Sequence, residues 1–182
     1  MRNLVLGAGA LLAMAASATS AGAAPVTGTV DITGSVEVRC EFGVGSALIA
    51  LGELSVSGPS GGQLNTSVVN GSSASLDGWC NGSASTMTVE AFALSNQDFL
   101  SSPPTGFDRV INYTATATAS PDGGDVSASD LTTSVGTGSP SVVGTFSSPI
   151  DVALSASSTP GGGKLVAGAY QGHVDVTLSP AT

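Results

Sequence analysis

Apolar and polar residues alternate along much of the chain, which is the period-two pattern of half-buried β-strands. The clearest case covers about 15 residues from Val26 to Cys40, where even positions are apolar or glycine and odd positions are polar. That length is unusual for a single strand. We therefore expect either one long strand or two strands in the same phase, joined at Gly34.

Clusters of Gly, Pro, Ser and Asn separate the other alternating segments. We expect further strands at residues 47–54, 73–80, 86–94, 109–118, 150–156 and 165–179. Asn81-Gly82 is a strong hairpin dipeptide, so it predicts that the segments on either side of it pair with each other. Residues 96–107 and 120–141 are expected to be irregular loops, and residues 159–164 a turn. Short strands at this spacing predict an all-β antiparallel sandwich.

The N-terminus has the features of a signal peptide. Arg2 precedes an apolar stretch at residues 4–16, and Ala21-Gly22-Ala23 fits a small-x-small cleavage site. A membrane anchor is the alternative, but the apolar core of about a dozen residues is shorter than the roughly 20 needed to span a bilayer. We expect residues 1–23 to be removed by cleavage after Ala23 or one residue later, and the protein to be exported.

Composition and charge restrict the function. The chain has 13 acidic and 4 basic residues and a formal net charge of −9, whereas a nucleic-acid partner requires a basic patch. The one histidine, His173, leaves no pair of histidines for a metal site. We expect no nucleic acid, no metal and no cofactor.

The two cysteines, Cys40 and Cys80, are expected to form a disulfide bond, because an exported protein meets an oxidising compartment. A free reactive thiol and a metal site are the alternatives. Neither has a histidine nearby in the sequence to support it.

Three patterns suggest chemistry, and each has a simpler explanation. Residues 58–62 match the G-x-S-x-G hydrolase motif around Ser60, but no strand–turn–helix pattern surrounds them. His173 is in phase with Asp175 on the polar edge of a strand, and nothing in the sequence indicates that a serine converges with them into a catalytic triad. A Gly-rich loop carries three acids whose spacing differs from that of a calcium-binding EF-hand: Asp122, Asp125 and Asp130. We expect no catalytic residues and no enzyme activity.

Three features occur in a distinctive order along the chain. An alternating segment interrupted by glycines, Pro25 to Gly34, follows the signal peptide. The second cysteine lies in Gly78-Trp-Cys-Asn-Gly82, just before a strand, and the C-terminal stretch has the form AG-x-Y…V-x-V-x-L. Together these features resemble subunits of chaperone–usher pili. The cysteine spacing and the final strand are most similar to the spore coat U-like, or archaic, branch.

The resemblance implies an immunoglobulin-like sandwich that lacks its last strand. In that family a periplasmic chaperone lends a strand, and at the outer-membrane usher the N-terminal extension of the next subunit replaces it. Residues 24–35 would be the donor extension and residues 36–182 the pilin domain. The implied donor residues are Val26, Gly28, Val30, Ile32 and Gly34, with Gly28 or Gly34 where the groove is shallow. The implied acceptor residues are Tyr170, Val174, Val176 and Leu178.

The expected function is therefore that of a structural subunit of a cell-surface pilus, which mediates adhesion or biofilm formation. Its partners would be identical or related pilins in a head-to-tail filament, a periplasmic chaperone and an outer-membrane usher. The main alternative is a secreted binding module, an adhesin or a carbohydrate-binding sandwich, whose N-terminal segment is an ordinary first strand of a complete domain. A secreted hydrolase would depend on Ser60 alone.

Overall fold

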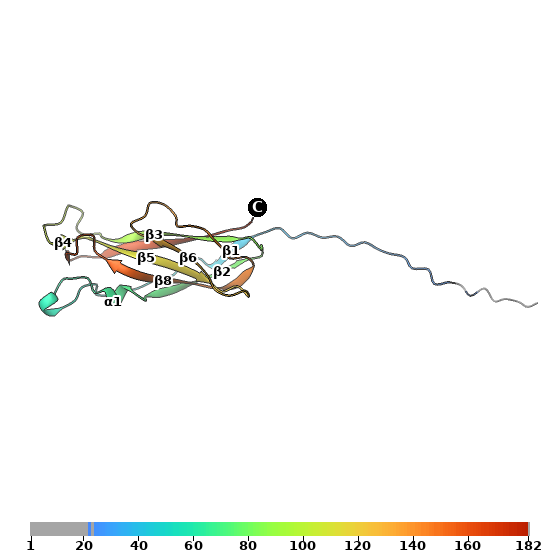
Figure 1. Cartoon of the computed structure of the whole chain (residues 1–182), viewed down its shortest axis with the longest axis horizontal. Coiled ribbons are helices and arrows are strands. Elements are labelled where there is room, and N and C mark those ends of the chain that lie inside the picture. Colours follow the sequence, from blue (N-terminus) through green and yellow to red (C-terminus); the bar gives the residue numbers. More distant parts are fainter. Residues whose placement is uncertain (1–21, 23, 182) are drawn as a thin grey trace, which may run out of the picture. The chain divides into compact units, whose positions relative to one another are not determined.

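The computed structural model describes residue 22 and residues 24–181. They fall into an N-terminal segment that ends at Ser35 and a domain that begins at Val36. The domain is nearly all β (Figure 1). Its elements are β1 (Cys40–Val44), η1 (Gly58–Ser60), α1 (Thr66–Val69), β2 (Ser73–Cys80), β3 (Thr86–Asn96), β4 (Phe107–Asp108), β5 (Val110–Ala119), β6 (Val126–Leu131), β7 (Ser141–Val142), β8 (Phe146–Ser158), β9 (Lys164–Leu165) and β10 (Tyr170–Ser179). No helix among the described residues has the length and apolar character that crossing a membrane requires.

The strands follow one hydrogen-bonded path in the order β1-β2-β8-β5-β3-β10, with β6 beside β5 and β7 beside β3. Pairing is antiparallel throughout, except between the two-residue strands β4 and β9. The path turns a corner between β3 and β5, which pair only at Leu94–Ile111 and Ser95–Val110. It therefore forms two layers, with β3, β7 and β10 in one and the remaining long strands in the other. The predicted all-β antiparallel sandwich is confirmed.

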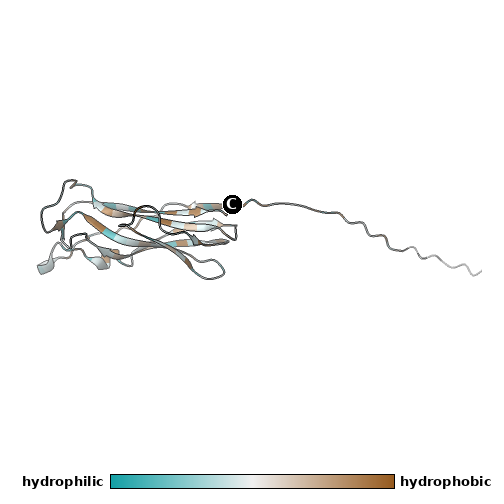
Figure 2. Cartoon of the chain, turned by 45° about the horizontal axis from the view of Figure 1, so that its top comes forward, coloured by the Kyte–Doolittle hydropathy of each residue, from teal (hydrophilic) through white to brown (hydrophobic). Residues whose placement is uncertain are grey.

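The core lies between the layers and is made by the buried half of each alternating strand. Figure 2 shows hydrophobic and hydrophilic residues mixed along these strands. In β5 the buried positions are Ile111, Tyr113 and three alanines, and in β8 they include Ile150, Val152 and Leu154. Small alanines let the two layers approach closely. The buried carboxylate of Asp130 belongs to this interior and accepts a hydrogen bond of 2.9 Å from the backbone N–H of Ala91. That bond compensates part of the cost of burying a charge.

The predicted hairpin at Asn81-Gly82 is wrong. β2 pairs with β1 and β8, whereas β3 pairs with β10, β5 and β7. The two strands belong to different layers, so the chain crosses the sandwich between them. Asn81 and Gly82 form no hairpin turn; they contact residues 37–39 instead, as described below.

Three segments differ from the alternation pattern. Residues 24–39 contain no strand, and β1 begins only at Cys40. Residues 47–54 also contain none; next to them is an isolated bridge between Ser55 and Leu64. Conversely, the predicted loop 120–141 contains β6 and ends at the first residue of β7. Alternation shows that a strand is possible, but a strand forms only where a neighbour supplies backbone hydrogen bonds.

The C-terminal strand starts later than predicted. Gly168 has a φ of +146°, which most residues do not adopt, and it separates β9 from β10. β9 instead pairs with β4, and the Asp108 carboxylate of β4 accepts hydrogen bonds from the backbone N–H groups of Gly161 and Gly163. These hydrogen bonds hold the predicted turn at 159–164 against β4.

Candidate functional site

The free edge of β10 is the feature of the domain with most potential to bind another molecule. Within residues 36–181, β10 pairs with β3 on one side and with no strand on the other. Residues 45–51 face this free edge without forming a strand, and no backbone–backbone hydrogen bond is made by residues 46–53 in the described chain. We call the space between β10 and residues 45–51 the groove. Two unpaired edges that face one space are a template for an added strand.

The groove begins with a cavity of about 520 Å³ beside residues 172–177 of β10, here called the first cavity. Its walls include Val174 and Val176 from β10 and Phe42 from β1. Core residues of the other layer form much of the remaining lining: Leu76, Tyr113, Val152 and Leu154. The hydrophobic core of the sandwich is therefore accessible from this side.

A second cavity of about 840 Å³ lies beside residues 165–172 and continues the groove. The residues that line both cavities are Leu48, Ile49, Leu51, Leu94 and Gly172. Leu48 is 84% exposed, although it is apolar.

Glu53 lies in the wall of the second cavity. Hydrogen bonds from the Ser55 hydroxyl and backbone N–H hold the pKa of the Glu53 carboxyl below its usual range. The first cavity is thus lined mainly by apolar residues, whereas polar and apolar residues both line the second.

An irregularity in β3 marks the place where the two cavities meet. The pairing of β10 with β3 shifts by one residue between Gln171 and His173. A Cβ on Gly172 would lie 2.7 Å from the carbonyl oxygen of Phe92, so no other residue fits there without movement of the backbone. The hydroxyl of Tyr113 donates a hydrogen bond shared between the carbonyl oxygens of Phe92, at 2.7 Å, and His173, at 3.2 Å. Tyr113, which lines the first cavity, is thus hydrogen-bonded to both β3 and β10 at this irregularity.

Tyr113 predicts a specific loss of stability at alkaline pH. Burial raises the pKa of Tyr113 to about 12, whereas an unfolded tyrosine loses its proton near pH 10. Between these values the folded state keeps a proton that the unfolded state has lost, so the free energy of unfolding falls as pH rises above about 10. Tyr113→Phe removes this contribution and costs about 1 kcal/mol at pH 8 through the lost hydrogen bond.

Urea unfolding of both proteins between pH 8 and pH 11 measures this effect. The midpoint of the wild type is expected to fall more steeply above pH 10 than that of Tyr113→Phe. Parallel curves for the two proteins would contradict the assignment, because all other titrating groups are shared.

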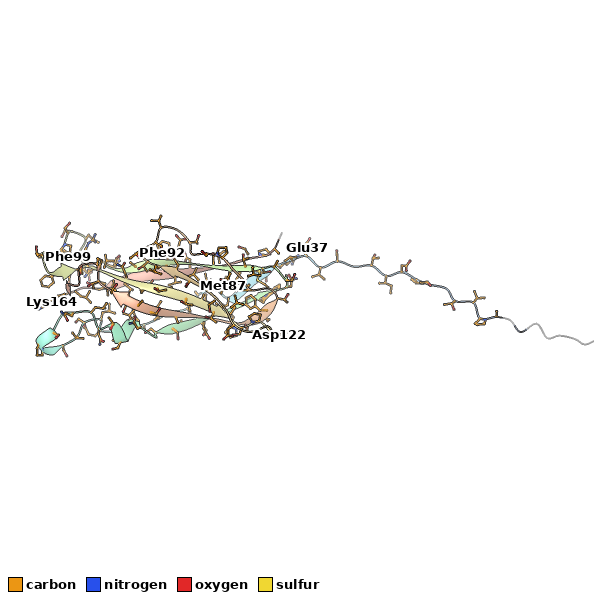
Figure 3. All side chains as sticks on the ribbon, in the orientation of Figure 1. Glu37, Met87, Phe92, Phe99, Asp122 and Lys164 are labelled. Atoms are coloured by element: carbon orange, nitrogen blue, oxygen red, sulfur yellow. A yellow bond between two sulfur atoms is a disulfide. The ribbon has the colours of Figure 1, made fainter. Side chains whose placement is uncertain are left out.

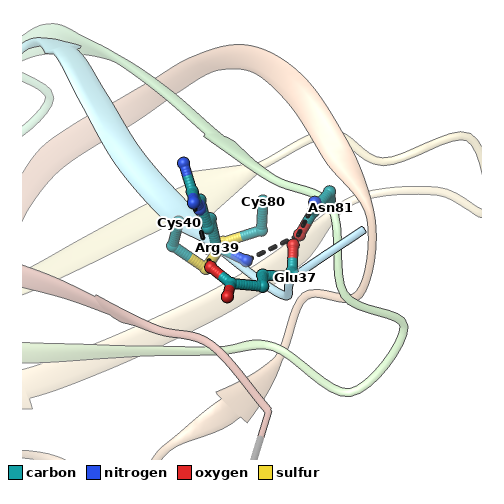
Figure 4. The surroundings of a disulfide bond; sticks show 5 residues. All are labelled: Glu37, Arg39, Cys40, Cys80 and Asn81. Atoms are coloured by element: carbon teal, nitrogen blue, oxygen red, sulfur yellow. Dashed lines mark hydrogen bonds and ion pairs between the residues drawn. A yellow bond between two sulfur atoms is a disulfide. The ribbon is translucent and has the colours of Figure 1, made fainter. Parts of the chain in front are cut away.

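Residues 37–39 are fastened to the domain beside the disulfide bond (Figure 4). The Asn81 side chain accepts a hydrogen bond from the Arg39 N–H at 2.7 Å and donates one to the Glu37 carbonyl oxygen at 2.9 Å. Val38 covers Gly82, where an added Cβ would clash with its side chain. Cys40 and Cys80 are bonded to each other, as predicted. The chain thus enters the domain at a fixed point.

This entry point lies at one end of the domain, which we call the entry end. Glu37 and Asp122 mark it in Figure 3, and Phe99 and Lys164 mark the opposite end, where β4 and β9 lie. β10 runs from Tyr170 at the opposite end to Ser179 at the entry end, because Tyr170 pairs with Asn96 and Ser179 with Thr86. The groove therefore extends lengthwise between the two ends.

The sequence-predicted binding residues are distributed as follows. Val26, Val30 and Ile32 are almost fully exposed, and Gly28 and Gly34 lie among them in the N-terminal segment. On β10, Tyr170 lines the second cavity, and Val174 and Val176 line the first. Leu178 lines neither cavity; its side chain lies over Gly78 together with Ile150 and Phe42. The first cavity is thus closed near the entry end by packed side chains.

Sequence reasoning missed two parts of the groove. Residues 45–51 were expected within or beside a strand, and nothing in the pattern indicates that they form a rim. Tyr113 was assigned to a strand without a role in the groove. The alternation that puts Tyr113 on the same face as Ile111 is the one feature of the sequence that indicates its inward position.

The residues considered for catalysis and calcium binding have other surroundings. Ser60 is exposed at the end of η1, and His173 stacks on Phe92 with ring centroids 4.1 Å apart. Asp130 is buried in β6, and Asp125 accepts a hydrogen bond from Ser120. Residue 22 and residues 24–181 contain no group of three or more His, Cys, Asp or Glu side chains placed to hold a metal ion.

Comparison with protein-family models, with curated proteins and with solved structures finds no match to this chain. The groove and the exposed N-terminal segment are therefore the features from which a function is inferred.

Proposed function

We propose that this chain is a structural subunit of a cell-surface pilus, built by insertion of residues 24–35 of one copy into the groove of the next. One observation carries this proposal. The domain leaves a groove open to its core along the free edge of β10, and the same chain carries an exposed, alternating segment that contains no strand in the described residues 24–35. In the proposed assembly the domain is an immunoglobulin-like sandwich whose last strand comes from a neighbour.

The segment and the groove match in length. At about 3.3 Å per residue, residues 24–35 span roughly 40 Å when extended. The 10 residues of β10 span roughly 33 Å. A donated strand therefore covers the whole free edge, and its backbone hydrogen bonds satisfy that edge.

The segment and the groove also match in chemistry. Val26, Val30 and Ile32 share one edge of the segment, and the first cavity of the groove is lined mainly by apolar residues. Each such side chain contributes about 1.5–3 kcal/mol when it is fully buried. Together with the added strand pairing, this supports a stable contact between copies. Because the contact is head-to-tail, it generates an open filament.

An open apolar groove is also a hazard before assembly, since exposed edges cause aggregation. The proposal therefore includes a periplasmic chaperone that covers the groove and an outer-membrane usher at which the exchange occurs. It also includes export directed by residues 1–23, a segment that lies outside the described residues except for Gly22.

Gel electrophoresis of the exported mature protein, with and without boiling, tests the proposal. The unboiled sample is expected to give a ladder of multiples that collapses to one band on boiling, because the contacts between copies are not covalent. Deletion of residues 24–33 is expected to leave a subunit that binds chaperone and gives no ladder.

Two outcomes would overturn the proposal. Filaments formed by the deletion variant would show that the segment is not the donor. A single monomer band from a protein that is soluble without any chaperone would indicate a domain complete in itself, and the binding-module alternative would replace the pilus subunit.

A further inference from the structure

We propose that a cavity beside Trp79, where β2 ends and β8 begins, binds a neutral sugar ring that lies on the indole of this residue. The cavity has a volume of about 450 Å³, and we call it the Trp79 pocket. It shares no lining residue with the two cavities of the groove. The inference therefore goes beyond the proposed function and does not rest on it.

Strand alternation places Trp79 on the outside of the sandwich. Its neighbours in β2, Gly78 and Cys80, are buried on the inner face, so the Trp79 side chain lies on the outer face. Trp79 is half-buried there, and it is the one tryptophan of the chain. An aromatic ring that faces inward contributes its whole surface to the core. Fixed on the outer face, the ring of Trp79 is partly open to a ligand.

Two further segments complete the pocket. β8 lies between β2 and β5, so Trp79 and the connection from β5 to β6 lie on either side of the first residues of β8. That connection contributes Pro121 and Asp122, and the start of β8 contributes residues 145–147. Asp122 lies at the entry end of the domain in Figure 3. The pocket is thus built from three segments that the sheet holds together.

The polar groups of the pocket are free to bind a ligand. Four of them form no hydrogen bond within the described part of the chain: the indole N–H of Trp79, the Asp122 carboxylate and the hydroxyls of Thr145 and Ser147. None of these atoms is sealed in the interior, and Asp122, Thr145 and Ser147 are exposed. The pocket therefore offers a donor, an acceptor and two hydroxyls that do both.

This set of groups matches a sugar ring. A pyranose has an apolar C–H face, which packs on an aromatic ring, and hydroxyls around its edge, which donate and accept hydrogen bonds. An anion is disfavoured, because Asp122 is acidic and no Lys or Arg lines the pocket. An organic cation would use the ring and the carboxylate, but it would leave the indole N–H and both hydroxyls without an acceptor. The favoured ligand is therefore a neutral pyranose.

The one tryptophan makes fluorescence a direct measurement of this pocket. The mature full-length protein is titrated with the methyl glycosides of glucose, galactose and mannose. At least one of them is expected to bind with a Kd of about 1 mM, as suits a small ligand held by one ring and a few hydrogen bonds. The emission maximum is expected to move to shorter wavelength as the sugar displaces water from the ring.

Three further probes test the ligand class. Sorbitol has the hydroxyls of a sugar without its ring face, N-acetylneuraminic acid is an anionic sugar, and arginine amide is an organic cation. Each is expected to bind at least about tenfold more weakly than the best methyl glycoside. Tighter binding of arginine amide than of every glycoside would overturn the assignment to a sugar. The absence of a shift with all three glycosides would overturn it too.

Asp122→Ala and Asp77→Ala are matched variants. Each removes one exposed carboxylate, but Asp122 lines the pocket, whereas Asp77, two residues before Trp79 on the same face of β2, lines none of the three cavities. Asp122→Ala is expected to weaken sugar binding about tenfold through the lost hydrogen bond. Asp77→Ala is expected to leave it within about twofold of the wild type. Equal effects of the two variants would overturn the site.

Trp79→Ala tests the aromatic surface itself, with binding followed by saturation-transfer NMR of the sugar because the fluorescence is lost. The folded variant is expected to show no saturation transfer, and normal transfer would overturn the role of Trp79. Loss of the unboiled ladder in this variant would assign the pocket to a contact between copies in place of a sugar. If Trp79→Ala does not fold, the two aspartate variants decide. A wild type that binds the glycosides but forms no ladder would refute the proposed function and support the sugar site.

Discussion

Replacement of Val176 by aspartate is expected to abolish filament formation while the free domain stays folded. Val176 is half-buried and lines the first cavity, where a donated strand would cover it. In the free subunit the new carboxylate still reaches water through the groove. In a filament it would be buried without a partner, which costs about 3–5 kcal/mol. That cost weakens the contact between copies by at least about a hundredfold.

Ser179→Asp is the matched control for this prediction. Ser179 also belongs to β10, but it is exposed and lines neither cavity. This variant should polymerise like the wild type. Unboiled electrophoresis measures assembly, and thermal unfolding followed by circular dichroism checks that both variants are folded. A full ladder from folded Val176→Asp would mean that the groove is not the site of assembly.

Local sequence patterns predicted those parts of the fold that depend on near neighbours along the chain. The alternation of Ile111, Tyr113 and Ala115 identified β5, and its inward face is the buried one. The same reasoning identified β2, β3 and β8, with boundaries that differ by a few residues at most. A strand with one buried face repeats every two residues, and the repeat is visible without knowledge of its partner.

Long-range pairing was not visible in the same way. Asn81-Gly82 has the composition of a hairpin turn, yet Asn81 uses its side chain to hold residues that lie more than 40 positions earlier. β6 was hidden because a charged residue, Asp130, faces the core and breaks the apolar alternation. The sequence pattern also did not predict that residues 45–51 border the groove, because they face β10, which lies at the other end of the chain.

The second large effect is expected from loss of the disulfide bond. Cys40 opens β1 and Cys80 ends β2, with a sequence separation of 40. Closing a loop of this size stabilises the folded state by about 4 kcal/mol in the chain-entropy model. A typical domain has only about 5–15 kcal/mol of stability. Cys40→Ala/Cys80→Ala is therefore expected to lose a large part of the free energy of unfolding, as measured by urea titration.

Reduction of the wild type provides the control. The chain has no other cysteine, so a reducing agent acts on this bond alone and leaves both side chains in place. The reduced protein and the alanine variant are expected to unfold at similar urea concentrations. A loss below about 1 kcal/mol in both would show that β1 is held by its pairing with β2 and not by the covalent bond.

The bond is also expected to matter for the proposed filament, because of where it lies. The donated segment joins its own domain through residues 36–39, and Cys40 follows at once. Tension along a filament would pass from that segment into β1, which has only 5 residues and one neighbouring strand. The disulfide carries the load on to β2, which lies between two strands. Reduced filaments should therefore break under shear into shorter lengths than oxidised ones, as measured by electron microscopy, and equal lengths would contradict this role.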